Sequence, residues 1–158
     1  MNTADFLNIA TSICPDKVAI IFEGKGFTFR QLNERGNRLA NGLAKLGVSK
    51  GDRVALLQVN CNQCVETYFA TAKLGAIYVP LNFRAKGDEL TYMINNSEAG
   101  IIFVGERYID LVNSLRPGLT SARHFISMES KHNEMLCYED MLSSSPVEEA
   151  VTEIEEDD

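Results

Sequence analysis

The segment from residue 27 to residue 82 constrains the fold most, because stretches of helical period alternate in it with short apolar runs. Thr28 and Gln31 have the spacing of a capping box, in which each residue satisfies a free amide of the other. An apolar stripe at helical spacing follows the box and consists of Phe29, Leu32, Leu39, Leu43 and Leu46. Gly47 is typical of a helix end. These residues predict a capped amphipathic helix over residues 28–46.

The next part of this segment predicts a strand, a helix and a second strand. The run VALLQV within residues 53–59 shows little polar alternation, which is typical of an interior strand covered on both faces. Asn60 and Gln63 repeat the capping pattern, so we expect a second helix there. Its inward-facing residues are predicted to be Val65, Phe69 and Ala72. A strand over residues 76–81 follows.

The remaining chain continues the alternation. Strands are predicted over residues 18–22, 27–29, 101–104 and 123–127, and helices over residues 88–96, 106–116 and 138–142. The N-terminus is predicted to be a short helix that docks on the body through Phe6, Ile9 or Ala10, and Ile13. Strands that alternate with helices through short loops indicate a layered α/β domain whose mostly parallel sheet is flanked by helices.

The charge of the chain is concentrated at its end. Of 158 residues, 22 are acidic and 15 basic, which gives a net charge of -7, and seven of the acids lie within residues 148–158. We therefore predict an α/β body over residues 1–147 and an acidic tail or linker over residues 148–158. The body is neutral and has no basic cluster, which argues against nucleic acid as a partner.

Apolar runs and the N-terminal residues indicate the compartment. No apolar run approaches the roughly 18 to 20 residues that a membrane span needs. The first residues carry Asp5 and lack a basic leader, unlike a secretory signal. We expect a cytoplasmic protein whose four cysteines stay reduced.

The glycines Gly24 and Gly26 between two β-favouring runs invite comparison with a phosphate-binding loop. Such a loop runs from a strand into a helix, whereas here a second strand follows at once. The pattern favours a hairpin turn that uses the positive φ angles glycine allows.

Cys61 and Cys64 form a CNQC pair at the predicted start of a helix. A dithiol gains acidity there, so a redox role like that of thioredoxin has a physical argument. No aromatic residue precedes the pair and no Gly-Pro separates the cysteines, which favours two structural cysteines instead. The other soft ligands, Cys14, Cys137, His124 and His132, lack paired spacing, so we expect no metal site.

The loop NFRAKGDEL follows a predicted strand, where ligand-binding loops emerge in open α/β sheets. It places Phe83 beside Arg84 and Lys86, and an aromatic ring next to cations can stack on a base and hold a phosphate. The alternative is a loop whose phenyl ring fills the core and whose cations are solvated.

Several blocks, in order, resemble the adenylate-forming acyl-CoA synthetases. They are PDKVAI, FTFRQLN, RLANGL, LGVSKGDRVALL, Asn60, KLGAIYVPLN, and EL followed by IIFV, and together they cover roughly residues 15–110. The resemblance implies the first part of the large N-terminal domain of such a ligase. In that family the full-length enzyme converts a carboxylic acid and Mg-ATP into an acyl-adenylate and then an acyl-CoA thioester.

The resemblance also implies roles for a few residues and a limit on activity. It puts Asn82, Phe83 and Arg84 near the CoA nucleotide, with Arg107 as a further phosphate contact, and it implies no catalytic residue in this part. The family's Ser/Thr/Gly-rich phosphate loop does not occur in the chain, so we expect these residues alone to be inactive. The sequence keeps open a dithiol oxidoreductase that uses Cys61 and Cys64, a non-catalytic α/β interaction module, and a homodimer. It does not identify the acid.

Overall fold

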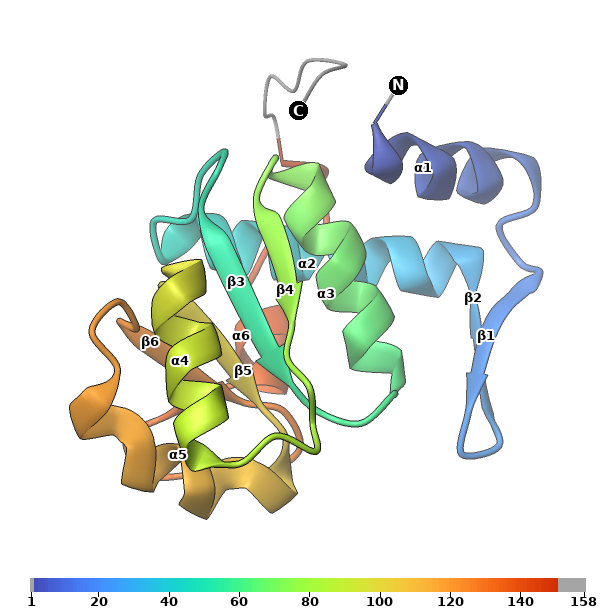
Figure 1. The fold of residues 1–158 in the computed structure, drawn as a ribbon. Helices are drawn as coiled ribbons and strands as arrows, with labels where there is room; N and C mark the ends of the chain where they lie inside the picture. Colours follow the sequence, from blue (N-terminus) through green and yellow to red (C-terminus); the bar gives the residue numbers. More distant parts are fainter. Residues whose placement is uncertain (1, 151–158) are drawn as a thin grey trace.

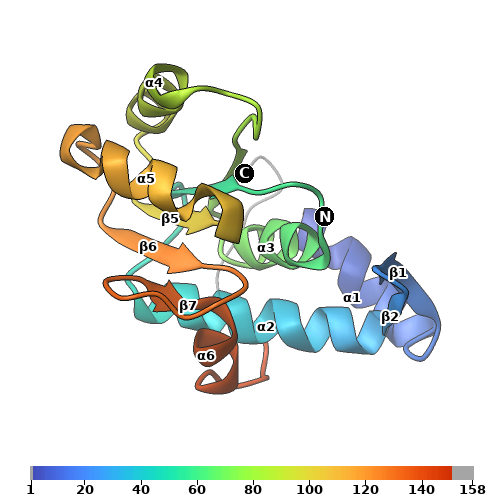
Figure 2. The same ribbon diagram turned by 90° about the horizontal axis from the view of Figure 1, so that it is seen from below.

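A computed structural model describes residues 2–150 and shows a parallel sheet between two layers of helices (Figures 1 and 2). The sheet has five strands in the order β4-β3-β5-β6-β7, all parallel. Their bounds are β3 Arg53–Leu57, β4 Ile77–Pro80, β5 Ile101–Val104, β6 His124–Ser127 and β7 Leu136–Cys137. The predicted layered α/β fold is confirmed.

Each face of the sheet is covered by its own helices. One face packs against α2 (Phe29–Lys45), α3 (Asn62–Lys73) and α6 (Tyr138–Ser143). The other packs against α4 (Gly87–Ser97) and α5 (Ile109–Leu115). Figure 2 shows α4 and α5 on the side of the sheet opposite α2 and α6. Since βαβ crossovers put helices on both faces, this arrangement buries the interior strands β3 and β5, whereas the edge strands β4 and β7 keep exposed residues.

The interior strand β3 packs against helices on both faces, which explains why its sequence lacks polar alternation. Val54 and Leu56 belong to the core under α2, α3 and α6, whereas Ala55 and Leu57 belong to the core under α4 and α5. All four are buried. The edge strand β4 accommodates Pro80, as an edge position allows.

The N-terminal part lies beside the sheet. It consists of α1 (Thr3–Ile13) and an antiparallel hairpin of β1 (Val18–Phe22) and β2 (Lys25–Thr28) (Figure 1). The predicted hairpin exists, but its positive φ angles belong to Glu23 and Gly24, whereas Gly26 lies within β2. Two successive positive φ angles are what a tight two-residue hairpin turn needs.

The predicted cap of α2 is confirmed, and Gly47 follows the helix with a φ of 89°. Thr28 Oγ1 accepts from Gln31 N at 3.2 Å, and Gln31 Oε1 accepts from Thr28 N at 2.9 Å. The capping prediction for α3 is wrong. Its N-cap is Cys61, which makes no side-chain cap, and the Gln63 amide instead donates to Met128 O at 2.7 Å.

The predicted inward faces of two helices are also wrong. Helix α1 buries Ala4 and Leu7 and leaves Phe6 and Ile13 61% and 77% exposed. Helix α3 buries mainly polar residues, namely Glu66, Thr67, Ala70, Thr71 and Lys73. Burial of the polar side chains among them costs little free energy because each has a hydrogen-bond partner.

The predicted helix over residues 106–116 is divided. A 3₁₀ turn η1 (Glu106–Tyr108) precedes α5, and a second turn η2 (Arg116–Gly118) holds Pro117. Proline lacks the amide that would continue the α-helical ladder, which explains why α5 ends at Leu115. Within residues 2–150, no helix has the length and apolar character needed to cross a membrane.

Candidate functional site

The carboxyl ends of the parallel strands meet at one edge of the sheet, where open α/β folds bind ligands. The loops that leave this edge contain Asn82 after β4, Gln58 after β3, Gly105 after β5 and Glu129 after β6. The edge therefore gathers residues that are far apart in the sequence.

The loop after β4 presents an aromatic ring and a cation to solvent. Asn82 Oδ1 accepts from Arg84 N at 3.0 Å, which closes a tight turn around Phe83. The Phe83 side chain is 40% exposed, and the Arg84 guanidinium carbon lies 5.3 Å from the centre of its ring. Among the described residues no carboxylate pairs with Arg84. Phe83 thus does not fill the core, and the pair is free to meet a ligand.

Arg107 lies at the same edge, exposed in the η1 turn that follows β5. Because β3 separates β4 from β5, their ends are two strand spacings, or about 10 Å, apart. The structure thus brings Arg107 to the edge that carries residues 82–84, on a separate loop.

A hydrogen-bonded cluster fixes the middle of this edge. The Gln58 amide donates to Glu129 Oε1, and its own oxygen accepts from Val59 N. Glu129 Oε2 accepts from Glu106 N at 2.8 Å. A Cβ atom on Gly105 would overlap the end of the Gln58 side chain, so a larger residue here would force Gln58 out of its hydrogen bonds.

This cluster was missed in the sequence, where the one signal was Gln58, a glutamine within the apolar run of β3. Its partner Glu129 is 71 residues away along the chain. The cluster ties the ends of β3, β5 and β6 together and so supports the loop that carries Arg107.

Cys61 and Cys64 lie at the start of α3, next to this edge. Their Sγ atoms are 3.4 Å apart, and Cys64 Sγ also contacts Val59 O at 3.5 Å. The hydrogen bond from the Cys61 thiol, with nearby backbone amides, outweighs burial and lowers the pKa of Cys64 to about 7. Donating that bond raises the pKa of Cys61. One of the two thiols is therefore acidic and the other holds its proton.

A buried carboxylate, Glu66, joins three helices below the hairpin. Glu66 is fully buried, and its oxygens accept from Arg35 Nε at 2.8 Å, Asn62 Nδ2 at 2.7 Å and the Tyr138 hydroxyl at 2.7 Å. Burial, reinforced by the Glu66 charge, raises the pKa of Tyr138. Arg35 also forms an ion pair with Glu139. The network clamps α2, α3 and α6.

A cavity of about 450 Å³ lies against this network. The residues that line it are Phe22, Glu23, Lys25, Phe27, Arg35, Asn62, Gln63 and Glu139. Within the described part of the chain, no three His, Cys, Asp or Glu side chains are grouped so as to hold a metal ion.

Comparisons with known proteins identify the chain's relatives. A crotonobetaine/carnitine–CoA ligase of Salmonella agona (strain SL483) is 32% identical over 85% of this chain and 30% of its own length. Its counterpart in Salmonella typhi is 31% identical with the same coverage. The chain thus spans about 30% of the length of the curated relatives it matches.

Solved structures agree with the sequence relatives. An anthranilate–CoA ligase in complex with anthranoyl-AMP superposes with a TM-score of 0.90 at 28% identity, over 94% of this chain and 29% of that protein. A fatty acyl-CoA synthetase of Mycobacterium tuberculosis gives 0.88 at 26% identity, over 97% and 30%. The family model described as AMP-binding enzyme matches residues 10–158. This confirms the resemblance found in the sequence, and the chain belongs to the AMP-binding enzyme family.

Proposed function

We propose that this chain is the first part of an AMP-forming acid–CoA ligase, and that its carboxyl edge serves the CoA nucleotide. The complete enzyme would convert a fatty or aryl carboxylic acid and Mg-ATP into an acyl-adenylate and transfer the acyl group to CoA. The names of the relatives support the reaction class, since they include ligases of carnitine, anthranilate and fatty acids.

The observation that carries the CoA assignment is the exposed pair of Phe83 and Arg84. CoA brings an adenine ring and several phosphates, and a phenyl face can stack on the base while a guanidinium binds phosphate in a bidentate manner. The Asn82 side chain holds the turn that presents both groups. Arg107, on the neighbouring loop, is placed to meet a second phosphate of an extended nucleotide.

Within residues 2–150, the glycine turn at Gly24 belongs to a hairpin and not to a strand-to-helix loop of the kind that binds phosphates, and the family's Ser/Thr/Gly-rich phosphate loop does not occur in the sequence. We therefore assign adenylation to other parts of the complete enzyme. A polypeptide of these 158 residues should show no acid-dependent exchange between ATP and pyrophosphate, and exchange above a blank would contradict this assignment.

The CoA role is tested with Arg84→Ala in the complete ligase. Loss of one hydrogen bond to a charged group removes roughly 1.5–3 kcal/mol, so KM for CoA should rise about 10- to 150-fold. KM for the acid and for ATP should stay unchanged. Arg53→Ala is the matched control, since Arg53 is a half-exposed arginine at the opposite, amino end of β3. An unchanged KM for CoA in Arg84→Ala removes Arg84 from the site.

The cellular location of the enzyme and the boundary of its folded body are part of the same proposal. We place it in the cytoplasm, which agrees with four cysteines that are all free thiols. We propose a folded body over residues 1–147, with the acidic residues that follow acting as a linker. Glu149, at the start of that linker, forms an ion pair with Lys73 at 2.9 Å. The five acidic residues of the linker beyond residue 150 lie outside the described part of the chain.

A further inference from the structure

The CoA site does not use the dithiol at the start of α3. Its two sulfur atoms lie 3.4 Å apart, whereas a disulfide bond is about 2.05 Å long. Closing the bond therefore needs an approach of about 1.4 Å, which side-chain rotation in one helical turn can supply. In the described chain each of these cysteines has the other as its thiol neighbour, whereas Cys14 contacts a backbone carbonyl.

The surroundings of the pair favour its reaction. Cys61 is the N-cap of a 12-residue helix and makes no capping bond, so both sulfurs lie where free backbone amides stabilise a thiolate. The pKa of Cys64 is lowered because the Cys61 thiol and nearby backbone amides stabilise its thiolate. Of the charged or titratable groups close to the pair, Glu129 raises the pKa of Cys64 and so partly opposes the amides, and Tyr78 interacts electrostatically with both sulfurs. Both cysteines are half-buried.

We propose that Cys61 and Cys64 form a thiol–disulfide exchange site that reacts with small disulfides such as glutathione disulfide. In the first step the Cys64 thiolate attacks one sulfur of the oxidant. A Cys64–glutathione bond forms, the oxidant's S–S bond breaks, and one glutathione thiolate leaves. In the second step Cys61 loses its proton to water, and its sulfur attacks Cys64 Sγ and expels the second glutathione thiolate.

The exchange is balanced. The two cysteines lose two electrons and two protons, and one glutathione disulfide becomes two glutathione molecules. The product is an intramolecular bridge across the first turn of α3. Forming it replaces the weak contact of Cys64 Sγ with Val59 O. The residues between the cysteines, Asn62 and Gln63, line the cavity of about 450 Å³ beside Arg35, whereas the two cysteines themselves do not line it.

The test is oxidation of the native chain with glutathione disulfide in buffers of increasing oxidised fraction, followed by thiol alkylation, mass spectrometry and peptide mapping. The chain should lose the mass of two hydrogen atoms, and two of its four thiols should become resistant to alkylation. The protected thiols should be Cys61 and Cys64, while Cys14 and Cys137 stay alkylated. A thiol reductant should restore all four.

The variant Cys61→Ser separates the two steps. It lacks the resolving thiol, so it should accumulate a mixed disulfide of one glutathione on Cys64, which the unmodified chain does not retain. The helical circular dichroism signal checks that the variant is folded. The proposal is overturned if four thiols remain alkylatable in excess glutathione disulfide, if the bridge involves Cys14 or Cys137, or if the unmodified chain retains the mixed disulfide as Cys61→Ser does.

Discussion

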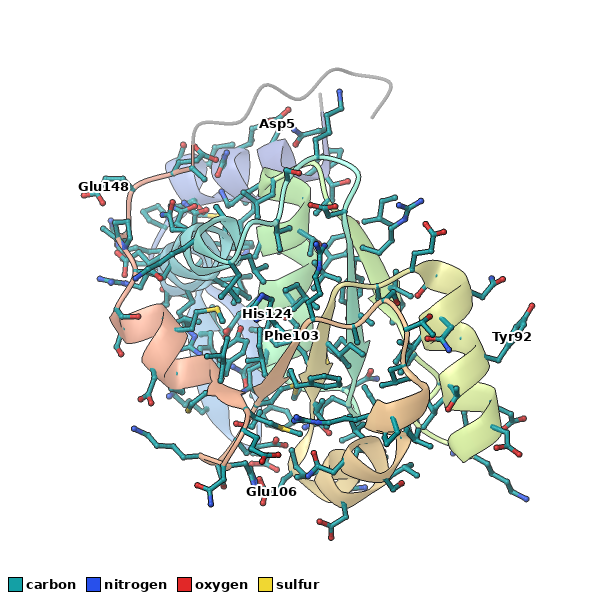
Figure 3. The ribbon with its side chains drawn as sticks, turned by 90° about the vertical axis from the view of Figure 1, so that its left-hand side faces the viewer. Asp5, Tyr92, Phe103, Glu106, His124 and Glu148 are labelled. Atoms are coloured by element: carbon teal, nitrogen blue, oxygen red, sulfur yellow. The ribbon has the colours of Figure 1, made fainter. Side chains whose placement is uncertain are left out.

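The clamp around Glu66 makes a quantitative prediction for Tyr138→Phe. Tyr138 is fully buried, and its hydroxyl donates to Glu66 Oε2 at 2.7 Å. Phenylalanine keeps the ring, which packs edge-on against Phe103 with centroids 5.7 Å apart, and removes only the donor. Phe103 lies within the sheet in Figure 3.

The magnitude follows from the partner's charge. A hydrogen bond to a charged group contributes roughly 1.5–3 kcal/mol, and the carboxylate remains buried in the variant with two donors in place of three. We expect Tyr138→Phe to lower the free energy of unfolding by about 2 kcal/mol. With a urea m-value of about 2 kcal/mol/M, the midpoint falls by about 1 M.

The assay is urea unfolding followed by circular dichroism, with Tyr92→Phe as the matched control. Tyr92 is 67% exposed on α4 and points away from the body in Figure 3, so its substitution should change stability by less than about 0.5 kcal/mol. If Tyr138→Phe were as stable as Tyr92→Phe, the charge-assisted bond would not stabilise the fold and the reasoning would be refuted.

Ionisation of Tyr138 predicts a dependence of stability on pH that the Tyr138→Phe variant should lack. Unfolded tyrosine ionises near pH 10, whereas in the folded chain burial and the Glu66 charge raise the pKa of Tyr138. Above about pH 10 the folded state therefore holds more protons than the unfolded state, so stability falls as pH rises. The contribution is complete below about pH 10 and is lost as pH rises toward the folded pKa. The stability gap between the unmodified chain and Tyr138→Phe should close over that range.

Two further substitutions test other contacts. Gly105→Ala should destabilise the chain by about 1–3 kcal/mol in the same urea assay because its methyl group overlaps Gln58, whereas Gly118→Ala, with its nearest neighbour at 3.7 Å, should cost less than 1 kcal/mol. Equal costs would show that the edge tolerates the methyl group. Burial raises the pKa of Glu149, but hydrogen bonds from a buried lysine and from an asparagine of α1 together lower it by more, so the net shift is downward. The ion pair of Glu149 therefore stabilises the fold above about pH 4.5, and this stabilisation is lost as pH falls through the folded pKa. Glu149→Gln should flatten the acid limb of a stability–pH curve, and Glu148→Gln, whose side chain points outward in Figure 3, should not; identical curves would contradict the role of this ion pair.

The sequence predicted those features that depend on neighbouring residues. The capping box of Thr28 and Gln31 acts over three residues, and the burial of β3 on both faces follows from its own composition. The faces of α1 and α3 were not predictable in this way. A hydrophobic stripe predicts an inward face only when the neighbouring elements are apolar. Helix α3 instead meets Arg35 and Asn8, which are 31 and 65 residues away from their partners on the helix.

The same distinction between local and long-range features applies to the residues of the candidate site. Residues 82–84 could be assigned to a ligand edge because a strand with a characteristic sequence precedes them. The cluster of Gln58, Gly105 and Glu129 could not, since it exists only because the strand order places β5 between β3 and β6. Which polar residues meet at the edge of a parallel sheet depends on topology, and topology is a property of the whole chain.

The two edges of the sheet can be compared by the hydrogen bonds that hold their loops. At the amino edge the connections are closed by backbone hydrogen bonds, such as those from Gly51 N to Gly75 O at 2.8 Å and from Arg123 N to Gly100 O at 2.8 Å. These bonds use the donors and acceptors that a ligand would need. At the carboxyl edge the loop after β4 is held by a bond from Arg84 N to the Asn82 side chain and by one from Ala85 N to Asn82 O at 3.0 Å, and its phenyl ring and guanidinium are left exposed. Under the proposed function, this exposed ring and guanidinium are the groups of the carboxyl edge that would meet a ligand.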